Sequence, residues 1–399
     1  MRLYNSLTRN KDPFTARDNR VGVYVCGITP YDATHLGHAF TYVHFDILVR
    51  YLRHLGYRVT YVQNLTDIDD DILRKSKELG RNWRALGEEV ADRFLEDMSW
   101  LGNFPPEVYP RATDLISEII VLSETLLRKG WAYESGGSVY FKVRSFKRFG
   151  LLSRLPEDRW LPTANERGNF PDDSKKQDPL DFVLWQAMKP GEPAWPSPWG
   201  KGRPGWHIEC SAMSMRYLGN TVDINGGGSD LIFPHHECSI AQSECATGET
   251  FVRHWMHTAM VMYQGKKMSK SDGNMVFVED LRHMGADAVR LLILLHHYRD
   301  TWTYREDGKQ KAQELAGLFR QVWRLQSGLG ERLDPQPFEK RFHAAMSDDL
   351  NVPEALRVME QLAKEILSDS VRNVSEAKGV LNGLSNLIGL KMRFGSDIG

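Results

Sequence analysis

The strongest constraint on the fold is a strand, loop, helix and strand pattern near the start of the chain. Residues 21–26 are an apolar run typical of a short buried strand, and residues 27–38 have the composition of a loop. Residues 40–55 carry apolar side chains at helical spacing, and residues 58–63 form a second strand pattern. This order predicts a βαβ unit and a parallel sheet, whose ligands bind beyond the carboxyl ends of the strands.

The rest of the first 300 residues is expected to add helices and an inserted segment. Helical periodicity covers residues 67–79, 83–101 and 115–129, and residues 136–144 are predicted to form a strand within the insertion. Residues 151–205 are rich in Pro, Gly, Trp and charge, so we expect a loop laid over a folded surface.

The end of the chain is predicted to be a helical bundle. From about residue 304 the pattern is helical almost throughout, with a break at residues 333–337 and a glycine-rich hinge near residues 379–383. We therefore divide the chain into a first domain over residues 1–304, with an insertion at approximately 100–205, and a C-terminal helical domain over residues 305–399.

Composition narrows the class of protein. The chain has 399 residues, of which 41% are hydrophobic, enough for a large core, and no apolar run approaches the ~20 residues that cross a bilayer. Its N-terminus lacks the apolar stretch of a signal peptide, which favours a cytoplasmic protein without a membrane partner. Four cysteines are too few for a disulfide framework, so metal binding or thiol chemistry is favoured. The formal net charge of −1 leaves a nucleic-acid partner open.

Two clusters suit chemistry on a nucleoside triphosphate. His35 and His38 flank Gly37 at the mouth of the predicted helix, where backbone N–H groups and the helix dipole favour phosphate oxygens. Residues 266–271 contain three lysines and two serines, and a mobile loop of this kind offsets charge on the α-phosphate and pyrophosphate. A solvated basic loop is the alternative for the second cluster.

Cys26, Cys210 and His235 form a third set of candidate residues. Thiolate and imidazole are ligands that zinc prefers, and three protein ligands with one open position are typical of a catalytic rather than a structural site. The spacing is not that of a zinc finger, so buried free cysteines are the alternative. Cys26 follows the first predicted strand and would place a metal beside His35.

A glycine-rich motif is a further candidate site. Residues 226–228 are consecutive glycines that permit close backbone approach to a ligand, and Asp230 offers a carboxylate for an ammonium group. A plain turn is the alternative for this motif.

Together these motifs resemble the class I cysteinyl-tRNA synthetase group over most of residues 1–300. The resemblance rests on Cys26 and Gly27 and on residues 35–38, 66–70, 205–211, 226–230, 233–237 and 267–271. It implies an α/β fold with a class I synthetase Rossmann-like (HUP) parallel-sheet catalytic domain, an inserted segment and a C-terminal helical bundle. It also implies an ATP-dependent, AMP-forming ligase that activates cysteine.

Within this group the chain is more similar to the cysteine ligases of mycothiol biosynthesis, which join cysteine to glucosaminyl-inositol. Residues 26–38 follow the ligase form of the loop, and residues 166–168 with Pro171 resemble a ligase motif, from which Asn169 and Phe170 depart. Ser239 stands where the synthetases supply a glutamate ligand to zinc. The helical tail carries equal numbers of acidic and basic residues, and we expect no added anticodon-binding domain.

We therefore expect a mycothiol-pathway ligase that forms cysteinyl-AMP and transfers cysteine to the amine of an amino-sugar inositol acceptor. A cysteinyl-tRNA synthetase, with tRNA as the partner, is the alternative. A catalytically silent relative that serves as a binding module is the third hypothesis.

The resemblance implies a role for each site residue. Cys26, Cys210 and His235 would hold one Zn²⁺ per chain, with the thiolate of L-cysteine as a further ligand. The residues around the substrate cysteine would be Gly27, Ile28, Thr29, Trp206, Gly228, Ser229 and Asp230. Those around ATP with Mg²⁺ would be Gly37, Thr41, Asn64, Thr66, Val261, Ser269 and Ser271. The catalytic residues, which stabilise charge on the phosphates, would be His35, His38, Lys267 and Lys270.

Overall fold

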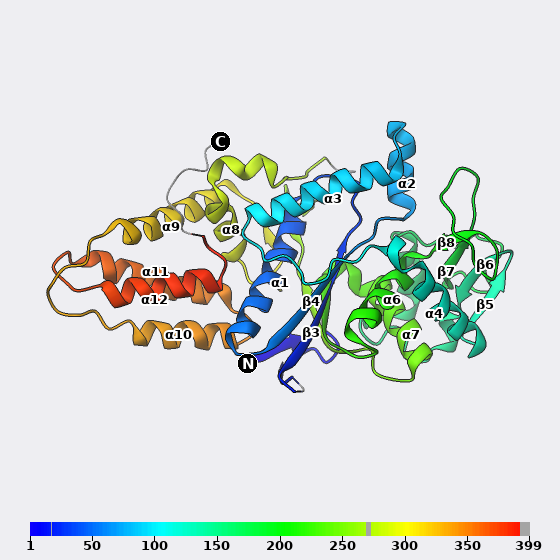
Figure 1. Ribbon diagram of the computed structural model, residues 1–399, viewed down its shortest axis with the longest axis horizontal. Helices are drawn as coiled ribbons and strands as arrows, with labels where there is room; N and C mark the ends of the chain where they lie inside the picture. Colours follow the sequence, from blue (N-terminus) through cyan, green and yellow to red (C-terminus); the bar gives the residue numbers. More distant parts are fainter. Residues whose placement is uncertain (17, 269–272, 392–399) are drawn as a thin grey trace.

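A four-stranded parallel sheet forms the centre of the computed structural model, which describes residues 1–16, 18–268 and 273–391. The strand order is β10-β9-β3-β4, and every neighbouring pair is parallel (Figure 1). The strands are β3 (Arg20–Ile28), β4 (Arg58–Leu65), β9 (Val222–Gly228) and β10 (Val252–Thr258). The predicted α/β class and its first two strands are confirmed.

Helix α1 (Leu36–His54) makes the crossover between β3 and β4 and begins earlier than the periodicity predicts. The reason is a cap: His35 Nδ1 accepts a hydrogen bond from His38 N at 3.3 Å, which satisfies one of the free N–H groups of the first turn. Helix α1 is buried along most of its length, because it packs on the sheet and also on α8 (Ala286–Leu294) and α12 (Ser375–Leu387). It lies on one side of the sheet, and α6 (Trp206–Leu218) lies on the other (Figure 1).

A second, antiparallel sheet lies beside the central one, in the order β5-β6-β7-β8. Its strands are β5 (Ala132–Ser135), β6 (Ser138–Phe141), β7 (Phe182–Ala187) and β8 (Gly202–Pro204). The expectation that residues 151–205 form only loop is therefore wrong, since they contain β7, β8 and helix α5 (Glu157–Asn165). The strands are short and flanked by proline and glycine, which hides their pattern, but Leu184 and Trp185 are fully buried.

The helices predicted at residues 67–79, 83–101 and 115–129 are present as α2 (Asp70–Leu79), α3 (Trp83–Trp100) and α4 (Ile116–Arg128). Helices α7 (Glu237–Thr247) and α8 (Ala286–Leu294) were not predicted. A hairpin of β1 (Arg2–Asn5) and β2 (Asn10–Pro13) contacts β10 through β1, and β11 (Val261–Tyr263) pairs with β12 (Lys266–Lys267) and β13 (Trp302–Thr303).

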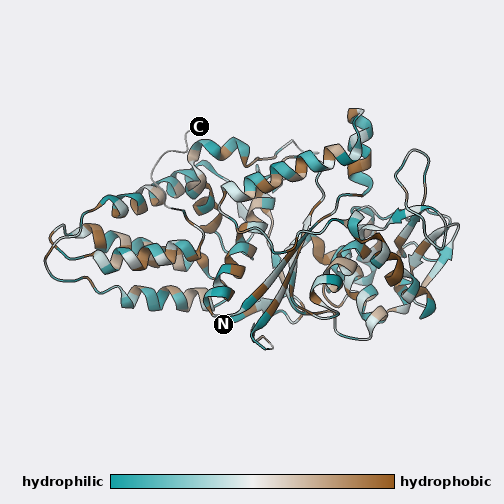
Figure 2. Cartoon of the chain, viewed as in Figure 1, coloured by the Kyte–Doolittle hydropathy of each residue, from teal (hydrophilic) through white to brown (hydrophobic). Residues whose placement is uncertain are grey.

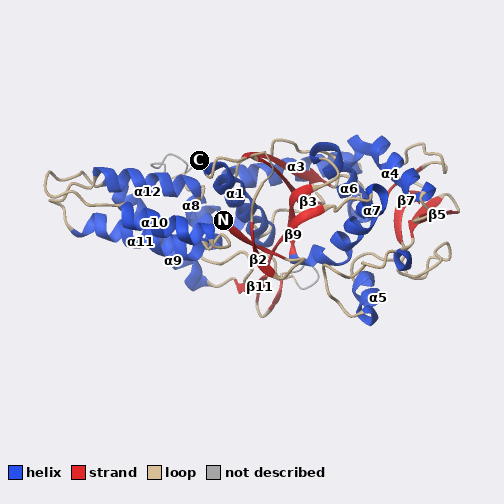
Figure 3. Ribbon diagram, turned by 90° about the horizontal axis from the view of Figure 1, so that it is seen from below, coloured by secondary structure: helices blue, strands red, loops and turns tan. Residues whose placement is uncertain are grey.

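Four helices form the predicted C-terminal bundle, at the left of Figure 1 and among the helices at the left of Figure 3. They are α9 (Glu306–Arg324), α10 (Gln336–Ser347), α11 (Val352–Ser368) and α12 (Ser375–Leu387). The prediction of a glycine-rich hinge near residues 379–383 is wrong. Gly379 and Gly383 lie inside α12 on its exposed face, opposite buried Leu381 and Leu384. The division of the chain at residues 304 and 305 stays a prediction.

Apolar residues gather on the central strands and on the inward faces of the helices (Figure 2). Among the described residues, none of the helices is both long and apolar enough to cross a bilayer.

Candidate functional site

At the carboxyl edge of the central sheet, glycines let neighbouring strands lie close together. A Cβ on Gly27 would lie 1.5 Å from the carbonyl oxygen of Asn64, and one on Gly226 would lie 2.1 Å from that of Met256. Real side chains do not tolerate such distances, so only glycine fits at either position. Asn64 Oδ1 accepts hydrogen bonds from Gly27 N at 2.9 Å and from Tyr24 Oη at 3.0 Å, which fixes the end of β3 against β4.

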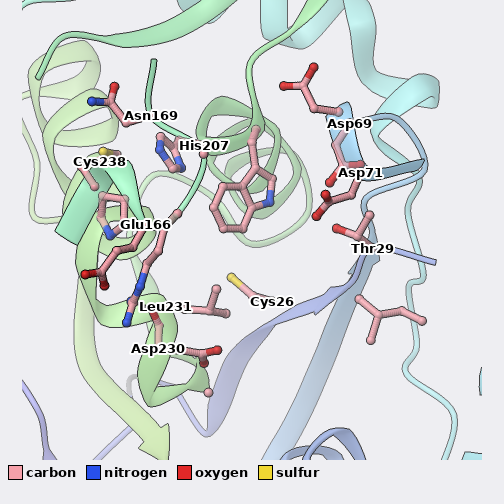
Figure 4. Close-up of a pocket in the computed structure, with 18 of the residues that line it drawn as sticks. Cys26, Thr29, Asp69, Asp71, Glu166, Asn169, His207, Asp230, Leu231 and Cys238 are labelled. Atoms are coloured by element: carbon pink, nitrogen blue, oxygen red, sulfur yellow. Dashed lines mark hydrogen bonds between the residues drawn. The ribbon is translucent and has the colours of Figure 1, made fainter. Parts of the chain in front are cut away.

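A pocket of about 1300 Å³ opens beyond this edge. In Figure 4, Thr29 and Asp69 lie along one side, Glu166 lies on the other, and Cys26 lies between them. The pocket brings together many of the predicted site residues: Cys26, Gly27, Ile28, Thr29, His35, Gly37, His38, Thr41, Trp206, Gly228, Asp230 and Val261.

His35 and His38 stand together at the N-terminus of α1. Their rings stack with centroids 3.6 Å apart, and a Cβ on Gly37 would lie 2.9 Å from the His35 ring. Gly37 is needed because a side chain at this position would clash with the His35 ring. The ring lies at the N-terminus of the helix, where the backbone N–H groups and the dipole attract anions.

The chain on either side of residues 269–272 also lies at the pocket. Met268 and Met275 line it, and Val276 O accepts a hydrogen bond from Leu36 N at 2.8 Å. The predicted residues Ser269, Lys270 and Ser271 are outside the described residues, and Lys267 is described only by its backbone, in β12.

Some predicted ATP residues lie elsewhere than on the expected loops. Thr41 is inside α1, where its hydroxyl lies 2.8 Å from that of Thr258. Asn64 ends β4 and donates from Nδ2 to Thr66 Oγ1 at 3.2 Å, so both residues support the sheet edge behind the pocket surface. Ser229, which starts the turn after β9, is not among the lining residues either. The roles of these residues toward ATP and cysteine stay predictions.

Of the predicted metal ligands, Cys26 lines the floor of the pocket, whereas Cys210 and His235 lie beneath the lining residues, and all are buried. Cys26 Sγ lies 3.8 Å from Cys210 Sγ, 3.6 Å from His235 Nε2 and 3.2 Å from His236 Nε2. A hydrogen bond between the two thiols lowers the pKa of Cys210 and raises that of Cys26.

This donor set fits a zinc ion. With Zn–S near 2.3 Å and Zn–N near 2.0 Å, a tetrahedron has edges of about 3.8 Å between two sulfurs and about 3.5 Å between sulfur and nitrogen. The distances from Cys26 to Cys210 and His235 match these edges, whereas the distance to His236 is shorter. Burial lowers the pKa of His236, which keeps this imidazole neutral beside the cluster.

Further histidines surround the cluster, and of these His257 was not expected from the sequence. His207 Nδ1 lies 3.0 Å from His235 Nδ1, and Trp206 stacks on the His235 ring with centroids 4.6 Å apart. His236 Nδ1 lies 2.8 Å from His257 Nε2. Contacts of this kind orient metal-binding imidazoles, but they join α6, the turn before α7 and β10, so no local pattern reveals them.

The side chains of Glu237 and Ser239, beside the cluster, are both occupied by other contacts. Glu237, next to His236, accepts hydrogen bonds from Ser153 N at 2.6 Å and Gly150 N at 3.1 Å, which turns it toward the insertion. Ser239 donates to His235 O at 2.9 Å. Neither side chain joins the described metal cluster.

Asp69 is a pocket residue that sequence reasoning missed. It accepts a hydrogen bond from Ile72 N at 2.9 Å as the cap of α2. Burial is the largest cause that raises the pKa of its carboxyl to about 6, with Asp71 and Asp70 adding repulsion. It lies on the same side of the pocket as Thr29 (Figure 4).

Comparisons with known proteins identify the fold and the family. Residues 14–314 match the family described as tRNA synthetases class I (C) catalytic domain, and residues 341–392 match the DALR domain. The chain is 49% identical to the cysteine–tRNA ligase of Alkalilimnicola ehrlichii, over 92% of this chain and 79% of that protein. It is 45% identical to that of Vibrio atlanticus, over 98% and 85%.

Solved class I synthetases share the fold at low identity. Mycobacterium tuberculosis methionyl-tRNA synthetase in complex with methionyl-adenylate superposes with a TM-score of 0.69 at 16% identity, over 94% of this chain and 91% of that chain. The LeuRS of Agrobacterium radiobacter K84, in a ternary complex, gives 0.68 at 12%, over 93% and 83%.

The expectation of a mycothiol-pathway ligase is wrong. It rested on single positions such as Ser239 and on the form of residues 26–38, whereas the relatives at 44 to 49% identity, which match over 92 to 98% of the chain, are cysteine–tRNA ligases. Similarity along the whole chain outweighs differences at a few positions. With the parallel sheet, the pocket and the matched domains, the chain belongs to the class I aminoacyl-tRNA synthetases, in the family of the class I (C) catalytic domain.

Proposed function

We propose that the protein is a cysteine–tRNA ligase, which activates L-cysteine with ATP and transfers it to tRNA(Cys). The observation that carries this proposal is the similarity to proteins of that name, at 44 to 49% identity over nearly the whole chain. The buried thiol and imidazole cluster at the floor of the pocket supports the choice of amino acid.

Cysteine is selected at this floor. Cys26, Cys210 and His235 would hold Zn²⁺, which when bound would favour a thiolate over the hydroxyl of serine. Size alone distinguishes two such similar side chains by only ~1 to 3 kcal/mol. Trp206 keeps His235 in place by stacking, and Asp230 lies in the same pocket to receive the substrate ammonium group.

Activation takes place at the N-terminus of α1. The carboxylate of cysteine attacks the α-phosphorus of ATP in line, a P–O bond forms, and pyrophosphate leaves with Mg²⁺. His35 and His38 stabilise the charge on the phosphates, as do Lys267, Lys270, Ser269 and Ser271 in our assignment. Gly37, Thr41 and Val261 line the nucleotide side of the pocket.

Transfer completes the reaction. A terminal ribose hydroxyl of tRNA attacks the carbonyl carbon of cysteinyl-AMP, an ester forms, and AMP leaves with the electron pair of the mixed anhydride. The tRNA end must reach the carbonyl through the mouth of the pocket, since the floor is closed by the sheet edge.

Two assays on the purified protein test this function. Pyrophosphate exchange with cysteine and ATP measures the first step, and labelled cysteine on tRNA(Cys) measures the second. We expect both activities, no exchange with serine, and no transfer to glucosaminyl-inositol. Exchange without any cysteine on tRNA would contradict the proposal.

A further inference from the structure

Phe170 is an exposed aromatic residue at the pocket that none of the roles above uses. Its side chain is 54% exposed, yet it lines the same pocket as His35 and His38. It belongs to the stretch of residues 166–170, in which Glu166 and Asn169 lie across the pocket from Asp69 (Figure 4). An exposed Phe on its own is ordinary, but one placed at the entrance to a reaction site is in contact with whatever enters.

The backbone beside Phe170 is held firmly. Asn169 Nδ2 donates to Asn165 Oδ1 at 2.7 Å and to Pro179 O at 3.0 Å, and Asn169 Oδ1 accepts from Lys176 Nζ at 2.6 Å. Arg167 donates to the carbonyl oxygens of Asp230 and Phe233, which ties this stretch to the pocket wall. A ring presented from an anchored segment loses little conformational entropy when a ligand stacks on it.

A cation lies next to the ring. Lys189 Nζ lies over one face of the Phe170 ring, 5.8 Å from its centroid, and the Lys189 side chain is 45% exposed, so a base would stack on the opposite face. Lys189 pairs with Asp70 at 3.9 Å, a distance at which an exposed ion pair is weak. Proteins bind single-stranded nucleic acid by stacking its bases on aromatic side chains and placing positive charge near its phosphates. Phe170 and Lys189 offer these two features together.

We propose that Phe170 is the stacking platform for an unpaired nucleotide at the 3′ end of the RNA acceptor, with Lys189 near its phosphate. The inference rests on the proposed function, because it is that reaction which brings an RNA end through the pocket mouth. A nucleotide outside the duplex exposes its base face, and such faces stack on aromatic side chains whatever the base.

Three substitutions of Phe170 test the platform, each with tRNA(Cys) charging and pyrophosphate exchange measured on the same preparation. Phe170→Ala should lower kcat/KM for tRNA by about 5- to 100-fold and leave exchange within about two-fold. Phe170→Trp should retain charging, whereas Phe170→Leu, which keeps apolar volume but has no π face, should behave like Phe170→Ala. Val121→Ala, on an exposed α4 residue, is the control and should change neither assay.

Other results would overturn the inference. Equal charging by wild type and Phe170→Ala would show that no base stacks on this residue. Full activity of Phe170→Leu would show that Phe170 contributes only apolar packing. A fall in exchange, with a higher KM for ATP, would place Phe170 on the nucleotide instead. A wild-type protein that exchanges pyrophosphate but charges no tRNA would remove the proposed function itself, and this inference with it.

Discussion

His236 Nδ1 lies 2.8 Å from His257 Nε2, and His257 Nδ1 lies 2.8 Å from Ser6 Oγ, so a chain of contacts runs from Cys26 to the loop after β1. We predict that His257→Ala weakens zinc binding by up to about 10-fold, because His257 holds His236, which contacts the ligand Cys26 and is not itself one of the proposed ligands. Competition with a chelator measures this affinity. His254→Gln, on the same strand but away from the cluster, is the control. Unchanged affinity in His257→Ala would contradict the prediction.

Cys210→Ser should remove zinc from the purified protein and abolish most cysteine activation, since the hydroxyl is a poor ligand for a soft site. Metal analysis and pyrophosphate exchange check the two effects separately. Cys245→Ser changes another buried cysteine that is not among the described contacts of the cluster, and it should keep both metal and activity. A Cys210→Ser protein with full zinc content would remove Cys210 from the ligand set.

Asp69 should make the protein less stable as the pH rises from about 4 to about 6. Its pKa is raised from 3.8 to about 6 in the folded state, so the folded protein binds this proton more tightly than the unfolded chain, and that advantage is lost as the pH passes the folded pKa. Asp69→Asn, which preserves a cap for α2, should therefore stabilise the protein at pH 7 by up to about 3 kcal/mol.

Urea unfolding of both proteins at pH 4 and pH 7 measures this difference. Asp92→Asn, on the exposed face of α3, should leave the pH profile as it is. If Asp69→Asn is less stable than wild type at pH 7, the carboxylate makes a favourable interaction that burial does not outweigh.

Arg290→Met should be destabilising. The Arg290 guanidinium is fully buried and donates to Asp46, to Ile388 O at 2.6 Å and to Leu101 O at 3.0 Å. Removal of Arg290 leaves buried Asp46 with Arg50 as its ion-pair partner, at 2.7 Å, and leaves the carbonyl oxygens of Ile388 and Leu101 without this donor, which should cost about 1 to 3 kcal/mol. Arg253→Met breaks the more exposed pair with Asp223 and should cost less than about 1 kcal/mol in the same unfolding experiment.

The parallel sheet was predictable because it depends on local pattern. Cys26 lies near the end of a strand with a clear apolar run, so it was expected at the ligand edge of the sheet, while its role as a metal ligand stays a prediction. The pairing of His236 with His257 was not predictable in this way, since it forms only when β10 packs beside the turn after β9. Strand β7 was missed because its apolar run is short and bounded by proline-rich turns, and Gly379 was misread because a glycine on an exposed helix face looks like a break.

The choice of acceptor was misjudged for a different reason. Ser239 differs from the expected glutamate, but its hydroxyl is occupied by His235 O, so the position says little about what lies outside the pocket. Recognition of the acceptor depends on the rim, where Phe170 and Lys189 come together from separate segments. No spacing in the sequence reveals that pair.

The environment of Arg290 also bears on how the chain reaches its native state. Its acceptors come from α1, from the turn after α3 and from the residue after α12, so they span nearly the full order of synthesis. Until Ile388 has been synthesised and has packed against α8, the Arg290 guanidinium lacks one of the hydrogen-bond acceptors that it has in the native protein. The central sheet and the C-terminal helices should therefore unfold in a single transition. A fragment that ends at the start of the helical bundle should aggregate and should not fold into an active domain.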